Sequence, residues 1–228
     1  MAVSNSNLRV CGSPGLPAQC FDLSQDLAGV KVYVQNQPVP VLYVNPGQVN
    51  FIMPSTALTG PVVVRVVNNA NSGPEVTVTL VGEAPAMFAN PSAAGYVIAT
   101  DASGKTVLTG DTPAHPGDVV VLYLTGLGMT TPNPAVGEIP SYAASICQMD
   151  QTAKPPVCSA TLGMQGLQVT LNGTAVDSKL ILYAGVTPGS AGLYQINFYV
   201  PAGTGDDPVI GVTAGGQPAQ TGLKLAVR

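Results

Sequence analysis

Several short segments of the chain alternate between apolar and polar residues with a period of two. Every second residue of Val30–Val34 is a valine, and the same alternation recurs in Val76–Leu80 and Leu223–Val227. This pattern is typical of antiparallel strands with one buried face. Val62–Val67 and Asp118–Leu124 are nearly continuous apolar runs, which predicts strands closer to the centre of a sheet. Turn residues separate these segments every 8–12 residues or so, as in a β-sandwich, and no convincing amphipathic helix is present.

The chain contains an internal repeat. Gln48–Pro54 (QVNFIMP) matches Gln195–Pro201 (QINFYVP) at an offset of 147 residues, which continues without a gap to the end of the chain. Further matched pairs are Val30–Val34 with Leu167–Leu171, Val41–Tyr43 with Ile181–Tyr183, Pro61–Val63 with Pro208–Ile210, and Val76–Leu80 with Leu223–Val227. A repeat of this length indicates two copies of one structural module.

The repeat predicts an all-β protein of two tandem immunoglobulin-like β-sandwich modules. We expect module 1 at residues 1–82, a connecting β-hairpin segment at 83–114, and module 2 at 115–228. The hairpin is predicted from Gly95–Thr100 and Lys105–Leu108, which flank a turn containing a glycine.

The two modules differ at their start. Module 2 opens with an apolar strand within Pro116–Gly128, whereas only ten residues precede Cys11 in module 1. Asn7–Val10 is a poor substitute for that strand. We therefore expect module 1 to lack its first strand and to expose an open sheet edge. Upstream residues, the 83–114 hairpin or a strand from another subunit would complete the edge, the last by β-augmentation.

The four cysteines follow the repeat. Cys11 and Cys20 precede the first strand pattern of one copy, and Cys147 and Cys158 precede that of the other. Of the three possible pairings, the duplication favours two local disulfides, Cys11–Cys20 and Cys147–Cys158. Zinc binding is the competing interpretation, but the spacings and the single histidine fit no common zinc pattern. Disulfides indicate an oxidising compartment and hence a secreted or cell-surface protein.

Composition and charge exclude several partners. The 228 residues include 26 Gly and 21 Pro, carry only 9% charged residues and have a net charge of −4. The cations are scattered, which argues against nucleic acid and against docking to anionic lipid. No apolar run reaches the roughly 20 residues that span a bilayer, and the first residues lack the apolar core of a signal peptide.

Three groups of motifs carry a further resemblance. They are Leu42–Phe51 (LYVNPGQVNF), Pro116–Asp118 with Thr125–Gly128, and Gly192–Phe198 with Val200–Ala202. Over about residues 28–228 the chain resembles an uncharacterised C-terminal module of secreted acidobacterial proteins. The resemblance implies immunoglobulin-like folds of the IPT/TIG type at the C-terminal end of larger exported proteins, and it transfers no catalytic residue.

Candidate chemistry is sparse. His115 is the only histidine, and its setting between two prolines indicates a connector rather than a catalytic residue. The carboxylates near turns, such as Asp101 and Asp118, show no calcium-loop spacing, so turn capping is the more usual role. We therefore expect no catalytic residue, no metal site and no cofactor. Asn172-Gly-Thr174 is a glycosylation sequon, but it is equally an Asn-Gly hairpin turn, which is the preferred interpretation.

Two polar pairs recur in both copies, Gln48 with Asn50 and Gln195 with Asn197. Two residues apart on a strand, they share a face. One interpretation makes them glycan or peptide contacts. The preferred interpretation makes them structural, with hydrogen bonds to neighbouring loop backbone.

These observations predict a non-catalytic extracellular structural or adhesive protein. Its partner would be protein, through self-association or the rest of a larger exported chain, with β-strand complementation into filaments as one mode. The alternative is a glycan-binding accessory module of a larger secreted protein. The absence of tryptophan disfavours this alternative, because sugar-binding faces usually carry exposed aromatic residues.

Overall fold

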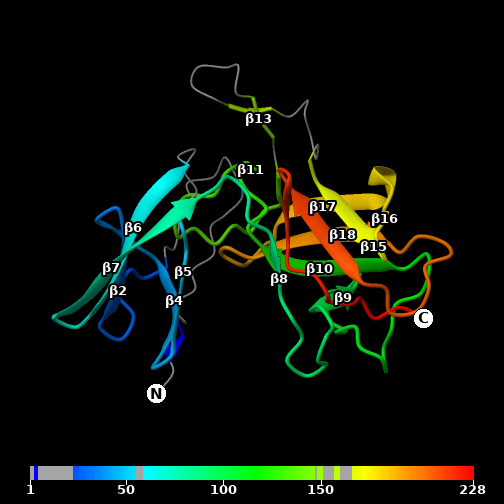
Figure 1. The fold of residues 1–228 in the computed structure, drawn as a ribbon, viewed down its shortest axis with the longest axis horizontal. Coiled ribbons are helices and arrows are strands. Elements are labelled where there is room, and N and C mark those ends of the chain that lie inside the picture. The colour runs from blue at the N-terminus through cyan, green and yellow to red at the C-terminus, as the bar shows by residue number, and fades with distance from the viewer. Residues whose placement is uncertain (1–2, 5–22, 55–58, 147, 151–156, 160–165) are drawn as a thin grey trace. The chain divides into compact units, whose positions relative to one another are not determined.

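The computed structural model describes residues 3–4, 23–54, 59–146, 148–150, 157–159 and 166–228 (Figure 1). These residues form β-strands, turns and one 3-10 helix, Ser178–Leu180, and the described chain contains no α-helix. The predicted all-β class is therefore confirmed. The chain divides into two compact units. Unit 1 comprises Met1–Gly82, Pro132–Ala144 and Thr187–Ala191, and unit 2 comprises Glu83–Thr131, Ser145–Val186 and Gly192–Arg228. The stretch 83–114, predicted as a separate connector, thus lies in unit 2.

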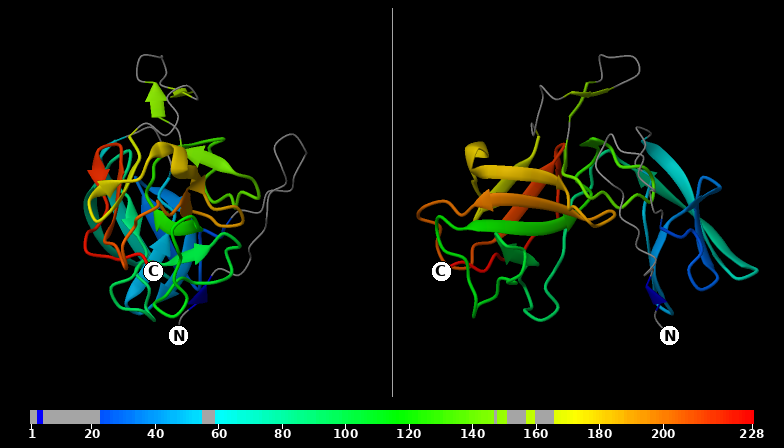
Figure 2. Two further views of the ribbon diagram at one scale, coloured as in Figure 1. Left: turned by 90° about the vertical axis from the view of Figure 1, so that its right-hand side faces the viewer. Right: turned by 180° about the vertical axis from the view of Figure 1, so that it is seen from behind.

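Unit 1 contains two antiparallel sheets. Its strands are β1 (Val3–Ser4), β2 (Val30–Val34), β3 (Gln37–Val39), β4 (Val41–Asn45), β5 (Gln48–Phe51), β6 (Gly60–Asn68) and β7 (Asn71–Leu80). One sheet has the order β1-β4-β5 and the other β3-β2-β6-β7. The long β6–β7 hairpin is clear in Figures 1 and 2. The buried core consists of valines, because every second residue of the alternating segments faces inward; they are Val32, Val34, Val39, Val41 and Val62.

Unit 2 has more strands and a larger core. Its strands are β8 (Ala86–Met87), β9 (Ala99–Asp101), β10 (Val119–Thr125), β11 (Thr130–Thr131), β12 (Ala144–Ile146), β13 (Gln148–Asp150), β14 (Val157–Ser159), β15 (Gln168–Leu171), β16 (Thr174–Ala175), β17 (Ile181–Val186), β18 (Tyr194–Tyr199), β19 (Ile210–Ala214) and β20 (Gln217–Pro218). The largest sheet has the order β11-β12-β17-β18-β10-β8, with β9 also paired to β10. A second sheet has the order β16-β15-β19-β20, and β13 pairs with β14. One continuous buried cluster draws on strands of the two larger sheets.

The two units repeat the same local geometry. In unit 1, Val41 pairs with Phe51 and Tyr43 with Asn50, with a register shift between the two pairs. In unit 2, Ile181 pairs with Phe198 and Tyr183 with Asn197, again with a shift. Each copy therefore has one extra residue at the same place, Leu42 or Leu182. An extra residue of this kind bends a strand and re-aims its side chains, so the bulge is part of the repeated module.

Strand pairing corrects one detail of the predicted repeat. Val34 lies opposite Val64 in the β2–β6 pair, whereas Leu171 lies opposite Ile210 in the β15–β19 pair. Val64 rather than Val63 thus occupies the place of Ile210, so the constant offset of 147 is wrong by one residue in β6. In β7 the offset of 147 residues holds again. Thr77 pairs with Val63 in unit 1, and Lys224, which is 147 residues after Thr77, forms the equivalent bridge to Val209 in unit 2.

The predicted turns are present. Asn172 and Gly173 join β15 to β16 with φ angles of +50° and +79°, the conformation of a type I′ hairpin turn. Gln35 and Asn36 make the same turn in unit 1, with φ angles of +49° and +62°. The Asn172 side chain also accepts a hydrogen bond from the Val209 N–H at 2.8 Å. Turn formation thus accounts for this asparagine.

The predicted hairpin within 83–114 is present as well. The Asp101 N–H donates to the Thr106 carbonyl, and the Leu108 N–H donates to the Ala99 carbonyl. Thr100 and Val107 form the bridge between the arms. Through β9, this hairpin adds to the edge of β10.

Candidate functional site

The strongest difference between the two units concerns the neighbours of β5 and β18, which are the repeated Gln-x-Asn-Phe strands. In unit 2, β18 pairs with β17 on one edge and with β10 on the other. In unit 1, β5 pairs with β4, and within the described part of the chain no strand pairs with its other edge. The short strand β1 pairs with β4, not with β5. The described residues therefore leave open the edge that β10 fills in unit 2.

Burial differs in the same region. Ile196 and Phe198 of β18 are fully buried, each with 0% of its surface exposed. Their counterparts in β5, Val49 and Phe51, are only partly buried. Equivalent side chains are thus less covered in unit 1, where the described residues supply no counterpart of β10.

The apolar residues of β7 are even more exposed. Val78 lies opposite Val62 and Val76 opposite Val64, so both share the core-facing side of the sheet. Nevertheless, 54% of Val76 and 37% of Val78 is exposed. In unit 2 the counterpart of Val78 is Leu225, which is fully buried. We call the open edge of β5 together with Val49, Phe51, Val76 and Val78 the acceptor surface.

The repeated polar pairs lie on the other face of the same strands. Gln48 Nε2 donates to Asn50 Oδ1 at 2.7 Å, and Gln195 Nε2 donates to Asn197 Oδ1 at 3.0 Å. Among the described residues, each glutamine therefore donates to the asparagine two residues further on, and the expected hydrogen bonds to loop backbone stay a prediction. Gln48 and Asn50 are exposed, whereas Gln195 and Asn197 are half-buried. The pairing supports a structural role common to both copies, and it leaves the unit 1 amides accessible.

Three of the four predicted disulfide cysteines, Cys11, Cys20 and Cys147, lie outside the described residues. Cys158 belongs to β14, where its backbone lies opposite Met149 of β13. The disulfide pairings therefore stay predictions.

His115 is bound into a turn. Its N–H donates to Asp118 Oδ2 at 2.8 Å, and its Nδ1 lies 3.4 Å from the same oxygen. The His115 and Asp118 side chains are 64% and 56% exposed. Because the two residues are three apart in the sequence and the carboxylate accepts from a backbone N–H, the contact is typical of a turn.

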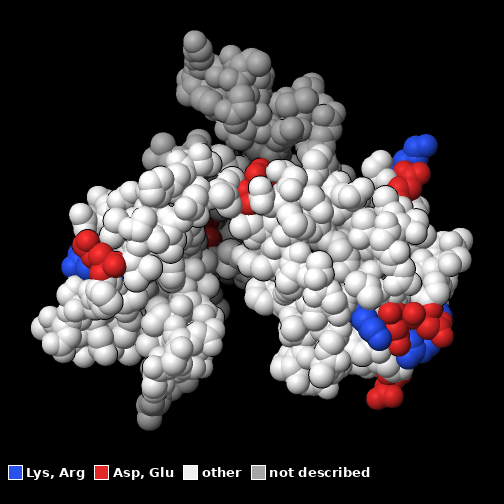
Figure 3. All heavy atoms as spheres, in the orientation of Figure 1, with Lys and Arg blue, Asp and Glu red and all other residues white. Residues whose placement is uncertain are grey.

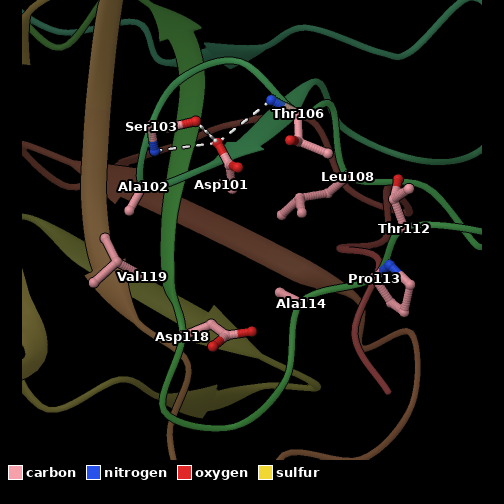
Figure 4. A pocket seen from close by; sticks show the side chains of 10 residues that line it. All are labelled: Asp101, Ala102, Ser103, Thr106, Leu108, Thr112, Pro113, Ala114, Asp118 and Val119. Atoms are coloured by element: carbon pink, nitrogen blue, oxygen red, sulfur yellow. Dashed lines mark hydrogen bonds between the residues drawn. The ribbon is translucent and has the colours of Figure 1, made fainter.

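The carboxylate of Asp101 caps its own hairpin turn. Oδ1 accepts hydrogen bonds from Ser103 Oγ at 2.7 Å and from the Ser103 N–H at 3.1 Å. These bonds, with further ones from Thr106 and Lys105, lower the pKa of Asp101 to about 2. Figure 4 shows Asp101 beside an open pocket whose walls also include Leu108, Ala114 and Asp118. Its Oδ1 is already committed to the turn, and no group of three metal-ligating side chains occurs among the described residues.

A second polar cluster lies near the C-terminus. Tyr96 Oη donates to Asp207 Oδ2 at 2.9 Å, and Arg228 Nη1 lies 2.5 Å from Asp207 Oδ1. Arg228, followed by Tyr96, holds the pKa of Asp207 below its usual range, while the Asp207 contact and burial raise the pKa of Tyr96. These bonds connect the 83–114 segment to the C-terminal segment within unit 2, which gives the cluster a structural purpose.

The surface carries few charges. On the face drawn in Figure 3, positive groups lie beside negative ones, and the described ion pairs include Lys31–Asp26 and Arg65–Glu75. Separately, none of the described residues forms a helix with the length and apolar character required to cross a membrane.

The acceptor surface combines one predicted feature with one that sequence reasoning missed. The absence of a first strand in module 1 predicted an open edge. The alternation in Val76–Leu80 predicted a half-buried strand, yet Val76 and Val78 are exposed. The sequence pattern that could have predicted this exposure is the short stretch before Cys11, because an edge to which no described strand is paired leaves the facing side chains uncovered. Comparison with known proteins found no matching family model, no matching curated protein and no matching solved structure.

Proposed function

We propose that the chain is a non-catalytic extracellular structural or adhesive protein, built from two immunoglobulin-like modules of the IPT/TIG type. In this proposal, unit 1 makes protein–protein contact by accepting a strand at the acceptor surface. Assembly of copies into chains or filaments by β-strand complementation is the mode that we favour.

The observation that carries the proposal is the pairing of the repeated strand. β18 has strand partners on both edges, whereas within the described residues β5 has one. An unpaired edge offers backbone N–H and C=O groups to a passing strand, and proteins normally protect such edges. Here the edge is accompanied by exposed Val76 and Val78, so a docking strand would gain backbone hydrogen bonds and apolar burial together.

Extracellular location is part of the proposal and rests on the four repeated cysteines. A glycan-binding role finds less support. The exposed apolar residues of β7, Val76 and Val78, suit strand packing better than stacking on sugar rings, and the exposed aromatic residues Phe88 and Tyr199 belong to unit 2, not to the acceptor surface of unit 1.

The proposal is tested by measuring the mass of the purified chain by light scattering over a wide range of concentrations. We expect the mass to increase with concentration for the natural sequence. The double variant Val76→Lys/Val78→Lys should remain monomeric, because it places two charges on the acceptor surface. The matched control is Thr77→Lys/Thr79→Lys, which adds the same charges to the opposite face of the same exposed strand and should still assemble.

A chain that stays monomeric at every concentration would contradict assembly through this surface. Equal loss of assembly in both double variants would also contradict it, because the effect would then come from net charge rather than from the valine face.

A further inference from the structure

This inference rests on the proposed function and specifies what the acceptor surface binds. We infer that its ligand is an extended segment of a partner polypeptide that runs antiparallel to β5 and carries large aliphatic residues at alternate positions. The sequence pattern and the direction of the segment follow from β10, which occupies the corresponding place in unit 2.

The inner face of β10 shows which side chains the place requires. Val120 lies opposite Phe198 and Leu122 opposite Ile196 in an antiparallel pair. All four side chains have 0% of their surface exposed. Since Phe51 and Val49 are the counterparts of Phe198 and Ile196, a bound segment should place aliphatic residues opposite both. A charged residue at either position would be buried without a partner, which is strongly unfavourable.

On the outer face of β10, Val121 and Tyr123 lie opposite Asn197 and Gln195. Val121 is buried in unit 2, whereas Tyr123 is only partly buried, so the position of Tyr123 is the less demanding one. The corresponding residues of β5 are Asn50 and Gln48, which are exposed. A substitution at the position of Tyr123 in a bound segment should therefore change affinity much less than substitutions at the inward positions.

The β10 of a second folded copy is not available for donation. It pairs with β18 on one edge and with β8 and β9 on the other, and its inner side chains belong to the unit 2 core. The natural segment therefore comes from a different stretch of polypeptide with the same pattern. The β10 sequence itself nevertheless serves as a probe when made as a free peptide.

The probe is a fluorescent peptide with the sequence of Pro116–Leu127 and a charged solubility tail, titrated with the full chain by fluorescence anisotropy. We expect saturable binding. A peptide with Leu122→Asp should bind at least about tenfold more weakly, because it buries a charge. A peptide with Tyr123→Ser should bind within about threefold of the parent, because the change lies on the outer face.

Two results would overturn the inference. One is equal affinity for the parent and Leu122→Asp peptides, which would show that binding has no preference for side-chain pattern. The other is absence of binding to the full chain, including the case in which binding appears only after residues 1–22 are removed, because the chain would then complete its own edge. If the chain assembles but binds the peptides without selectivity, the proposed function stands and this inference is wrong. If the chain binds the peptides selectively but stays monomeric, this inference stands and only self-assembly is contradicted.

Discussion

Phe51 and Phe198 occupy equivalent positions in the two units, where each lies opposite an aliphatic residue across a bulged strand pair, but only Phe198 is fully buried. On its second edge, Phe198 also lies opposite Val120 of β10. Phe51 has no such second neighbour among the described strands. The difference in burial between Phe51 and Phe198 therefore measures how much one additional strand covers the core of a sandwich.

This difference predicts unequal effects of truncation. Phe198→Ala should lower the free energy of unfolding of unit 2 by about 3 to 5 kcal/mol, the usual loss for a fully buried phenylalanine. Phe51→Ala should lower that of unit 1 by about half as much or less, since less surface and a smaller cavity are involved. Urea denaturation of each variant measures both values. Similar losses at the two positions would show that Phe51 is covered as well as Phe198.

The backbone conformation and close surroundings of Gly126 predict that only glycine is tolerated at this position. Its φ is +75°, and a Cβ added there would lie 1.9 Å from the Ala84 carbonyl oxygen. The backbone is held at this place because the Ala84 N–H donates to the Gly126 carbonyl at 2.8 Å. Gly126→Ala should therefore destabilise unit 2 by about 2 to 4 kcal/mol, from the left-handed backbone and the clash together.

The matched control for this substitution is Gly110→Ala. A Cβ at Gly110 would meet no atom within 4 Å, and its φ is not in the left-handed region. Thermal unfolding of both variants tests the prediction, and Gly110→Ala should unfold within a degree or two of the natural sequence, since an unobstructed surface change is worth no more than about 0.5 kcal/mol. Equal unfolding temperatures for the two variants would contradict it.

Asp101 predicts a contribution to stability that depends on pH. Hydrogen bonds from Ser103 and its neighbours hold the pKa of Asp101 at about 2, below the roughly 3.9 expected in the unfolded chain. A carboxyl group with a depressed folded pKa stabilises the fold above its unfolded pKa, and this contribution is lost as the pH falls from about 4 towards 2. Asp101→Asn should therefore be less stable than the natural sequence at pH 7, with the difference shrinking in that window. Denaturation at a series of pH values measures it, with exposed Asp111→Asn as the control; a difference that does not change with pH would contradict it.

Local patterns predicted much of this fold because they depend on neighbours in the sequence. The alternation of Val30–Val34 predicted the buried face of β2, and Asn172-Gly173 predicted the turn between β15 and β16, since both follow from backbone geometry. The register of β6 could not be predicted in the same way. Val62, Val63 and Val64 are all apolar, so a slip of one residue still places valine on the core side.

The candidate site was predictable only in part, for a related physical reason. Alternation shows which residues of β7 share a face, but it does not show whether another layer covers that face. The exposure of Val76 and Val78 depends on a strand that is absent from the described part of unit 1, and strand pairing is a property of the whole sheet. Similarly, the two-residue spacing placed Gln48 and Asn50 on one face, whereas their choice of each other as partners depends on side-chain conformation.

The last prediction concerns the cysteines and follows from the β13–β14 hairpin. Gln148 lies opposite Ser159 in this pair, and these residues directly follow Cys147 and Cys158 in the sequence. The hairpin thus brings together the neighbours of both cysteines, which favours a local Cys147–Cys158 bridge over a bridge to the other repeat. Mass-spectrometric mapping of peptides without reductant should recover Cys147 linked to Cys158 and Cys11 linked to Cys20. Reduction should remove roughly 2.5 to 3 kcal/mol of stability per loop in the chain-entropy model, and a Cys147→Ser/Cys158→Ser variant should no longer respond to reductant at that loop. Four free thiols in protein from its native source would contradict the bridges and, with them, the extracellular location.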